Sequence, residues 1–210
     1  MVNDNLINTL KPYMGAKLFK KGEEITADLE RSKTVYLVET GVVLVENING
    51  NPDSVRKVGV MRSKGALIGL EFIYVEESQG VVVVTAVTDS NILSIGVNQL
   101  VSLLDKDLKM YKEEITKDMV KYLSNSYAEM RDLYESTMIR NASESVISAM
   151  ETIGAVLGST HSSGGIVVPV KCPVIASVAG LVGEVARRTL RKLSEEGKVA
   201  RVAEGFLLFK

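Results

Sequence analysis

The sequence contains few of the residues that build disulfide, metal and haem sites. Its 210 residues include one cysteine, Cys172, one histidine, His161, and no tryptophan. A single cysteine excludes a disulfide within the chain and any iron–sulfur or zinc site made of several cysteines. A single histidine excludes a site with two imidazole ligands. We therefore expect no cofactor. We interpret His161 as a loop residue and Cys172 as the residue at the start of a helix. A redox-active thiol is the alternative for Cys172.

Long apolar runs are missing too. Runs such as residues 81–84 are far shorter than the roughly 20 residues that a membrane-spanning helix needs. The first residues lack the basic start and apolar stretch of a signal peptide. Adjacent acid pairs such as Glu23 with Glu24 have no nucleophile or metal ligand beside them. We expect a cytoplasmic protein that contacts no membrane and is not an enzyme.

The charge of the chain is unevenly distributed. The 25 basic and 26 acidic residues give a net charge of −1. Residues 171–210 hold eight of the basic and four of the acidic residues, a net charge of +4, so the rest of the chain carries −5. A mildly acidic body followed by a basic end predicts two domains, of which only the second binds a polyanion.

The first 97 residues have a β pattern. Short runs rich in β-branched residues cover 35–39, 42–46, 55–61, 81–87 and 91–95. Gly41 separates the first two runs like a hairpin break, and residues 49–53 form a strong turn signal. Strands at this spacing predict an antiparallel roll, barrel or sandwich.

The next segment has a helical pattern. Neither glycine nor proline occurs between Gln99 and Thr137. Apolar or small residues recur at steps of three and four: Leu108, Tyr111, Ile115, Met119, Tyr122, Ser126, Met130, Leu133 and Thr137. This stripe fits a helix lying on its own domain or a helical seam between two subunits. We favour the seam, and therefore a homodimer.

The basic end has the pattern of a helix-turn-helix followed by a hairpin. Helices are predicted over 143–157, 173–179 and 183–196, and strands over 166–170, 199–202 and 206–209. Ala176 provides the small residue where two helices touch, and Gly180 the left-handed turn between them. The residues expected to share a core are Ile175, Ala179, Leu181, Ala186 and Leu190.

The second of these helices presents charged residues on its opposite face. Glu184, Arg187 and Arg188 lie in its first turns, where a helix in the major groove reaches base edges. Arg191 and Lys192 lie farther along and suit phosphate contacts, which orient a protein on DNA without specifying sequence. The alternatives are that these charges are only solvated, with Glu184 paired to Arg188, or that the winged helix binds protein.

Taken together, the chain resembles the CRP/FNR superfamily of bacterial transcription regulators. The residues that carry the resemblance are 18–25, 35–44, the turn 65–69, and the helix 180–193 with residues 195–197 after it. The resemblance implies an α+β protein with a cyclic-nucleotide-binding-like β-roll (1–97), a long dimerisation helix (98–138) and a C-terminal winged helix-turn-helix (139–210). It also implies that Glu184 and Arg188 read bases. The chain departs from the family at Val182, Gly183 and Val185, where relatives often carry polar residues.

The resemblance also bears on what the first domain senses. Cyclic-nucleotide-binding members carry a glutamate after the glycine matched by Gly69, and an Arg-Ser pair that neutralises the cyclic phosphate. Here those positions hold Leu70, with Glu71 one residue later, and Gly80 with Val81. A buried phosphate without a cation is strongly disfavoured. We expect these five residues to mark an effector pocket that does not take cyclic AMP in the usual mode.

The function predicted from the sequence is sequence-specific regulation of transcription. The protein is expected to bind a near-palindromic DNA site as a homodimer and to respond to an unidentified small effector. RNA polymerase remains open as a further partner. The alternative is a regulatory or scaffolding module whose winged helix binds protein rather than DNA. Binding to duplex DNA that weakens with salt would separate the two.

Overall fold

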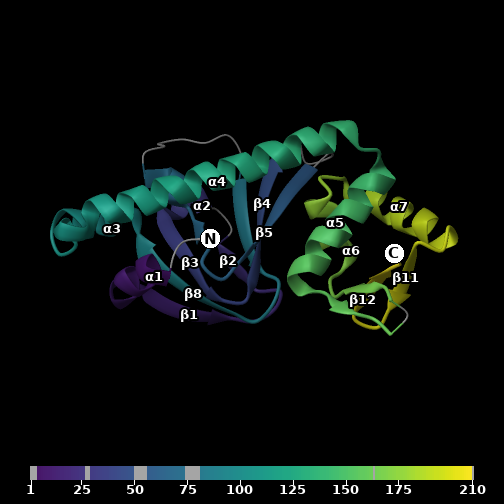
Figure 1. Ribbon diagram of the computed structural model, residues 1–210, viewed down its shortest axis with the longest axis horizontal. Helices are drawn as coiled ribbons and strands as arrows, with labels where there is room; N and C mark the ends of the chain where they lie inside the picture. The colour runs from purple at the N-terminus through teal and green to yellow at the C-terminus, as the bar shows by residue number, and fades with distance from the viewer. Residues whose placement is uncertain (1–3, 27–28, 50–55, 74–80, 163, 210) are drawn as a thin grey trace. The chain divides into compact units, whose positions relative to one another are not determined.

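The structure is a computed structural model, and it describes residues 4–26, 29–49, 56–73, 81–162 and 164–209 (Figure 1). The chain divides into two compact units. The first comprises Met1–Val45 with Arg62–Asp132, and the second comprises Glu46–Met61 with Leu133–Lys210. In the described part of the chain, no helix is both long and apolar enough to cross a membrane.

The predicted antiparallel β architecture is confirmed. Two four-stranded sheets form, in the orders β1-β8-β3-β6 and β2-β7-β4-β5. A cluster of buried side chains joins them, contributed by β1, β3, β4, β7 and β8 among others. The elements are α1 (Asp4–Leu10), η1 (Lys11–Tyr13), β1 (Gly15–Phe19), β2 (Glu24–Thr26), α2 (Leu29–Ser32), β3 (Thr34–Thr40), β4 (Val42–Asn49), β5 (Arg56–Ser63), β6 (Leu67–Ile68), η2 (Leu70–Ile73), β7 (Val81–Ala86) and β8 (Ser90–Gly96).

The predicted hairpin at Gly41 is wrong. Strands β3 and β4 lie in different sheets, so Gly41 is the corner at which the chain crosses from one sheet to the other. Its φ of +89° is in the left-handed region, and a Cβ there would lie 2.2 Å from the Ser90 hydroxyl oxygen. Backbone conformation and packing therefore both require glycine at this corner.

The helical segment is interrupted near its start, which the apolar pattern of the sequence did not predict. Helix α3 (Val97–Asp105) ends before the short turn η3 (Lys109–Tyr111), and the long helix α4 (Lys112–Ile139) begins only there. Leu100 and Leu103 on α3, Leu108 in the break, and Ile115 on α4 are all buried in one cluster. The turn lets α3 and α4 both present apolar residues to the same core.

The expected subunit seam is also wrong over the first half of α4. Ile115, Met119 and Tyr122 are buried against the core of the first unit, so the alternative of a helix lying on its own domain holds there. Figure 1 shows α4 running along the strands of this unit. Tyr111 and Met130, which belong to the predicted stripe, are exposed.

A largely buried arginine on β5 forms an ion pair with α4. Only 17% of the Arg62 side chain is exposed, and its Nη1 lies 2.8 Å from Oε2 of Glu129 on α4. The Tyr122 hydroxyl hydrogen-bonds with Ser126 and with the backbone of Leu67. Burial raises the pKa of that hydroxyl, although the positive charge of Arg62 acts in the opposite direction.

The second unit contains the predicted winged helix. Its elements are α5 (Ala142–Leu157), β9 (Ser159–Thr160), β10 (Ile166–Val168), α6 (Cys172–Val178), α7 (Gly183–Glu195), β11 (Val199–Val202) and β12 (Gly205–Leu208), and its sheet order is β11-β12-β10-β9. The Asn141 side chain accepts hydrogen bonds from the N–H groups of Ser143 and Glu144, and the Glu144 side chain accepts one from the Asn141 N–H. This capping box fixes the start of α5. His161 is half-buried in the turn between β9 and β10.

Candidate nucleic-acid interface

Helices α6 and α7 meet through the turn that the sequence predicts. Gly180 has a φ of +63°, in the left-handed region. The Leu181 N–H donates to the Ala176 carbonyl at 2.9 Å, which closes the turn. Ala176 is buried, as are four of the five residues predicted to share the core: Ile175, Ala179, Ala186 and Leu190. The fifth, Leu181, is only half-buried.

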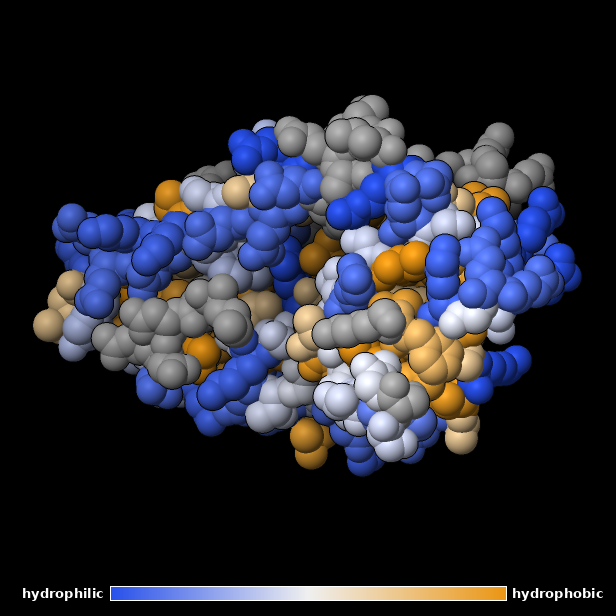
Figure 2. Space-filling model, turned by 45° about the vertical axis from the view of Figure 1, so that its right-hand side comes forward, coloured by the Kyte–Doolittle hydropathy of each residue, from blue (hydrophilic) through white to orange (hydrophobic). Residues whose placement is uncertain are grey.

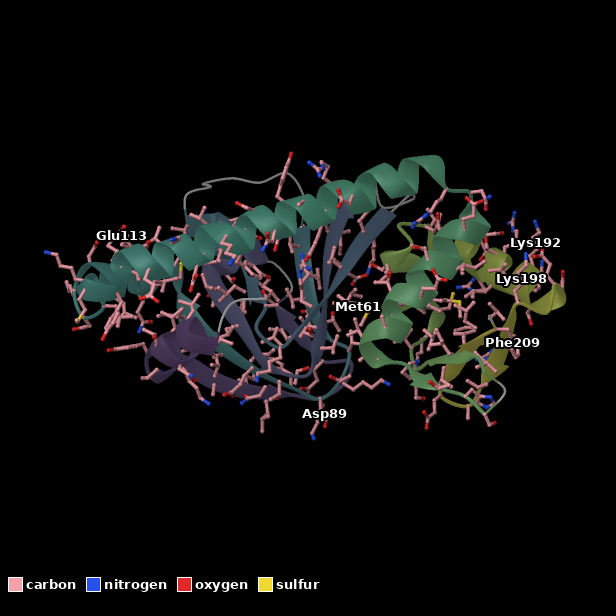
Figure 3. The ribbon with its side chains drawn as sticks, viewed as in Figure 1. Met61, Asp89, Glu113, Lys192, Lys198 and Phe209 are labelled. Carbon is pink, nitrogen blue, oxygen red and sulfur yellow. The ribbon has the colours of Figure 1, made fainter. Side chains whose placement is uncertain are left out.

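Helix α7 has one apolar and one charged face. Ala186, Thr189, Leu190 and Leu193 are buried on the inner face. The five residues predicted to contact DNA all lie exposed on the rest of its surface: Glu184, Arg187, Arg188, Arg191 and Lys192. Figure 3 shows Lys192 and, just beyond the helix, Lys198 on the outer side of this unit. The structure therefore brings the predicted residues together on one helix.

The ion pairs on α7 differ from the expected one. Nη1 of Arg187 lies 2.7 Å from Oε2 of Glu184, three residues earlier. Arg188, the expected partner of Glu184, forms no ion pair with any described residue. Nε of Arg191 lies 4.0 Å from Oε1 of Glu195, and Nζ of Lys192 lies 3.9 Å from Oε1 of Glu196. Arg188 therefore has its full set of guanidinium donors available for a ligand.

A groove lies between α7 and the hairpin of β11 and β12. Its volume is about 680 Å³, and the apolar residues that line it include Leu190, Val199 and Phe206. Arg187 and Arg191 line it from α7, and two cations that the sequence analysis did not single out, Lys171 and Arg201, line it from other segments. The +4 net charge of residues 171–210 was the available signal for them. Figure 2 shows apolar and hydrophilic surfaces side by side over this unit.

Cys172 lines the same groove. Burial raises the pKa of its thiol, while the positive charge of Arg187 acts the other way. A raised pKa lowers the fraction of reactive thiolate at neutral pH. Cys172 is the first residue of α6, as the sequence predicts, and Pro173 follows it in the first turn of that helix.

The first turn of α7 carries apolar side chains instead of polar ones. Val182 and Val185 are both exposed, and a Cβ at Gly183 would meet no atom within 4 Å. These three positions depart from the family pattern noted in the sequence. They leave Glu184, Arg187 and Arg188 as the charged side chains nearest to this end of the helix.

No family model matches the chain, and no curated protein matches it as a relative. Solved structures match over nearly the full length. The c-di-GMP-responsive global regulator CLP of Xanthomonas campestris is 16% identical, with a TM-score of 0.83, over 99% of this chain and 100% of CLP. The chain has the CRP/FNR fold. A CRP/FNR regulator of Thermus thermophilus is 19% identical, with a TM-score of 0.69, over 93% of this chain and 94% of its own. FixK2 of Bradyrhizobium japonicum is 19% identical, with a TM-score of 0.64, over 94% of this chain and 92% of its own.

Within this CRP/FNR fold, the residues expected to form an effector pocket do not gather into one polar site. Leu70 is buried in the apolar core of the first unit. Glu71 follows it on η2 and is exposed. Gly69 is buried with a φ of +89°, and Val81 is 43% exposed at the start of β7. Gly80 lies outside the described residues.

Proposed function

We propose that this protein is a sequence-specific DNA-binding regulator of transcription. The observation that carries the proposal is the exposed face of α7, where Arg188 is unpaired among the described residues and stands next to Glu184, Arg191 and Lys192. An α-helix with such a face fits the major groove of B-DNA. The CRP/FNR fold supports this proposal, because the matching solved structures are described as transcription regulators.

The residues of α7 take two roles in this proposal. Arg188 donates two hydrogen bonds to a guanine, and Glu184 accepts from a cytosine amino group. Arg187, held by Glu184, supports that geometry and reaches bases or the adjoining backbone. Arg191 and Lys192 contact phosphates, which fix the helix in the groove without adding sequence preference.

The protein acts as a homodimer through a stripe on α4 next to the one predicted from the sequence. Val120, Leu123, Tyr127 and Met130 follow one another at steps of three and four, and between 37% and 72% of each residue is exposed. Such spacing on a helix of 28 residues, roughly 42 Å long, is typical of the seam of a two-stranded coiled coil. A second copy of α4 covers these four residues, and the twofold symmetry requires a near-palindromic DNA site.

Regulation by an effector is the remaining part of the proposal. The roll (1–97) serves as the sensor, residues 98–138 as the connecting and dimerising segment, and residues 139–210 as the DNA-binding domain. Cyclic AMP in the usual mode is not the effector, because Leu70 is buried in an apolar core and leaves no carboxylate at that position. A thermal-shift screen identifies the effector, with c-di-GMP included because CLP is described as responsive to it.

Binding to duplex DNA tests the function. The full chain is titrated against a duplex of mixed sequence, about three helical turns long, at several salt concentrations. We expect an affinity that falls steeply as salt rises, since phosphate contacts release counterions. The alternative function, in which the winged helix binds protein, predicts no measurable binding to the duplex at any salt concentration.

A further inference from the structure

Two exposed valines stand among the charged residues at the start of α7. Val182 is the N-cap residue and is 44% exposed, and Val185 lies in the first turn and is 42% exposed. In α7, every residue of which the structure describes, Val185 is the one exposed residue with an apolar side chain. The hydrogen bonds and phosphate contacts proposed for this helix involve neither valine.

The two valines and the glycine between them form a small apolar surface at the start of the helix. An N-cap side chain lies next to the residue three positions later, so Val182 and Val185 are neighbours. Gly183 adds no side chain, and a Cβ there would meet no atom within 4 Å, so another molecule can approach closely. Arg188 lies three residues beyond Val185, so this apolar surface adjoins the arginine proposed to read a base.

We propose that Val182 and Val185 contact the C5-methyl groups of thymines, so that α7 selects A·T pairs next to the guanine bound by Arg188. The inference rests on the proposed function and adds a base preference to it. Thymine displays its methyl group in the major groove, and apolar side chains recognise it there. A valine side chain has no hydrogen-bond donor to offer a phosphate. The polar contacts proposed for α7 read guanine and cytosine, which leaves A·T pairs without another reader.

Removal of single methyl groups from the DNA tests this assignment. A duplex that the full chain enriches from a random pool is resynthesised with deoxyuridine in place of one half-site thymine at a time. Deoxyuridine pairs as thymine does and lacks only the C5-methyl group. The affinities of the wild type, Val182→Ala and Val185→Ala are measured on each duplex. Val156→Ala is the matched control, because Val156 is also 44% exposed but lies on α5.

The expected result is that a valine and a methyl group act as a pair. For the wild type, deoxyuridine at a contacted thymine lowers the affinity about fourfold, the factor for burying one methyl-sized group. The variant that lacks the contacting valine binds the thymine and deoxyuridine duplexes equally, whereas Val156→Ala keeps the difference. Alanine favours a helix more than valine does, so loss of α7 does not account for a lower affinity of Val185→Ala.

Other outcomes would contradict the assignment. If the wild type binds the enriched duplex but tolerates deoxyuridine at every half-site thymine, or enriches half-sites without thymine, the valines read no methyl group and the proposed function stands. If deoxyuridine weakens the wild type and both valine variants equally, the methyl group acts through another residue or through DNA shape. If the wild type binds no duplex, the valine assignment and the proposed function both fail.

Discussion

The Arg187 guanidinium donates a hydrogen bond to the Glu184 carboxylate at 2.7 Å on the exposed face of α7. The spacing of four residues between Glu184 and Arg188 had favoured a pair between those two instead. Because Glu184 takes the nearer arginine, Arg188 keeps both edges of its guanidinium for a planar acceptor. Under the proposed function, Arg187 would support Glu184 and Arg188 would read a base.

Removing the reading arginine should affect affinity and specificity together. Arg188→Ala is expected to cost about 1–3 kcal/mol of binding free energy on the preferred site and to relax discrimination at one base pair in each half-site. Lys192→Ala should weaken binding about equally on all sequences and lower the salt slope by roughly one. Titration of both variants on the preferred and a scrambled duplex measures the difference. Equal behaviour of the two variants would rule out Arg188 as a base reader.

The exposed stripe on α4 should control the oligomeric state. Val120→Glu combined with Tyr127→Glu places charges along the proposed seam and should give monomers, because a buried unpaired carboxylate is strongly disfavoured. Lys121→Glu is the control, since that exposed residue lies on α4 away from the stripe. Sedimentation velocity measures the outcome. A double variant that still sediments as a dimer would place the interface elsewhere.

The β-roll of the first unit is expected not to bind cyclic AMP at micromolar concentration. Leu70, which the sequence resemblance matches to the glutamate of cyclic-nucleotide-binding members, lies within an apolar core. Isothermal titration calorimetry with cyclic AMP is expected to show no saturable heat. Saturable micromolar binding would mean that another cation, such as the largely buried Arg62, neutralises the phosphate.

The turn of the helix-turn-helix offers a matched pair of glycines. Gly180 has a left-handed φ of +63°, so Gly180→Ala should lower the free energy of unfolding by about 1–2 kcal/mol. Gly183 starts α7 and has open space around its Cβ position, so Gly183→Ala should be neutral or stabilising. Chemical denaturation of the two variants measures both effects. Equal destabilisation would show that the conformation of Gly180 is not the constraint.

Alkaline pH should destabilise the first unit through Tyr122. Burial raises the pKa of this hydroxyl above its ordinary value of 10.0, so the folded state holds its proton more firmly than the unfolded state. This contribution to stability is complete below the ordinary pKa of 10.0 and is lost as the pH rises through the higher pKa of the folded state. Tyr122→Phe should flatten the fall in unfolding free energy between about pH 9.5 and 11, measured by denaturation at each pH. An unchanged slope would mean that Tyr122 ionises as easily when folded.

Local chemistry let the sequence predict the winged helix well. Gly180 and Ala176 specify the turn between α6 and α7, and the charged stripe on α7 specifies which face is exposed. The roles of Glu184, Arg188 and Lys192 on DNA stay predictions. Lys171 and Arg201 were missed because each is an isolated cation in the sequence, and only folding brings them to one groove.

Long-range packing explains what the sequence pattern could not decide. Two stripes with steps of three and four run side by side on α4, one through Ile115 and Tyr122 and one through Val120 and Tyr127. Periodicity alone does not say which stripe meets the roll, because that depends on the break before Lys112. The corner at Gly41 was read as a hairpin for a similar reason, since strands in different sheets have the same local pattern as paired ones.

Selection of preferred sequences from a pool of random duplexes tests the central claim most directly. The wild-type chain is expected to enrich a near-palindrome whose two half-sites are centred about 34 Å apart, one turn of the double helix. A footprint on the enriched duplex should protect two successive major grooves on one side. Recovery of unenriched sequences, or binding that is the same on every duplex, would contradict sequence-specific readout by α7.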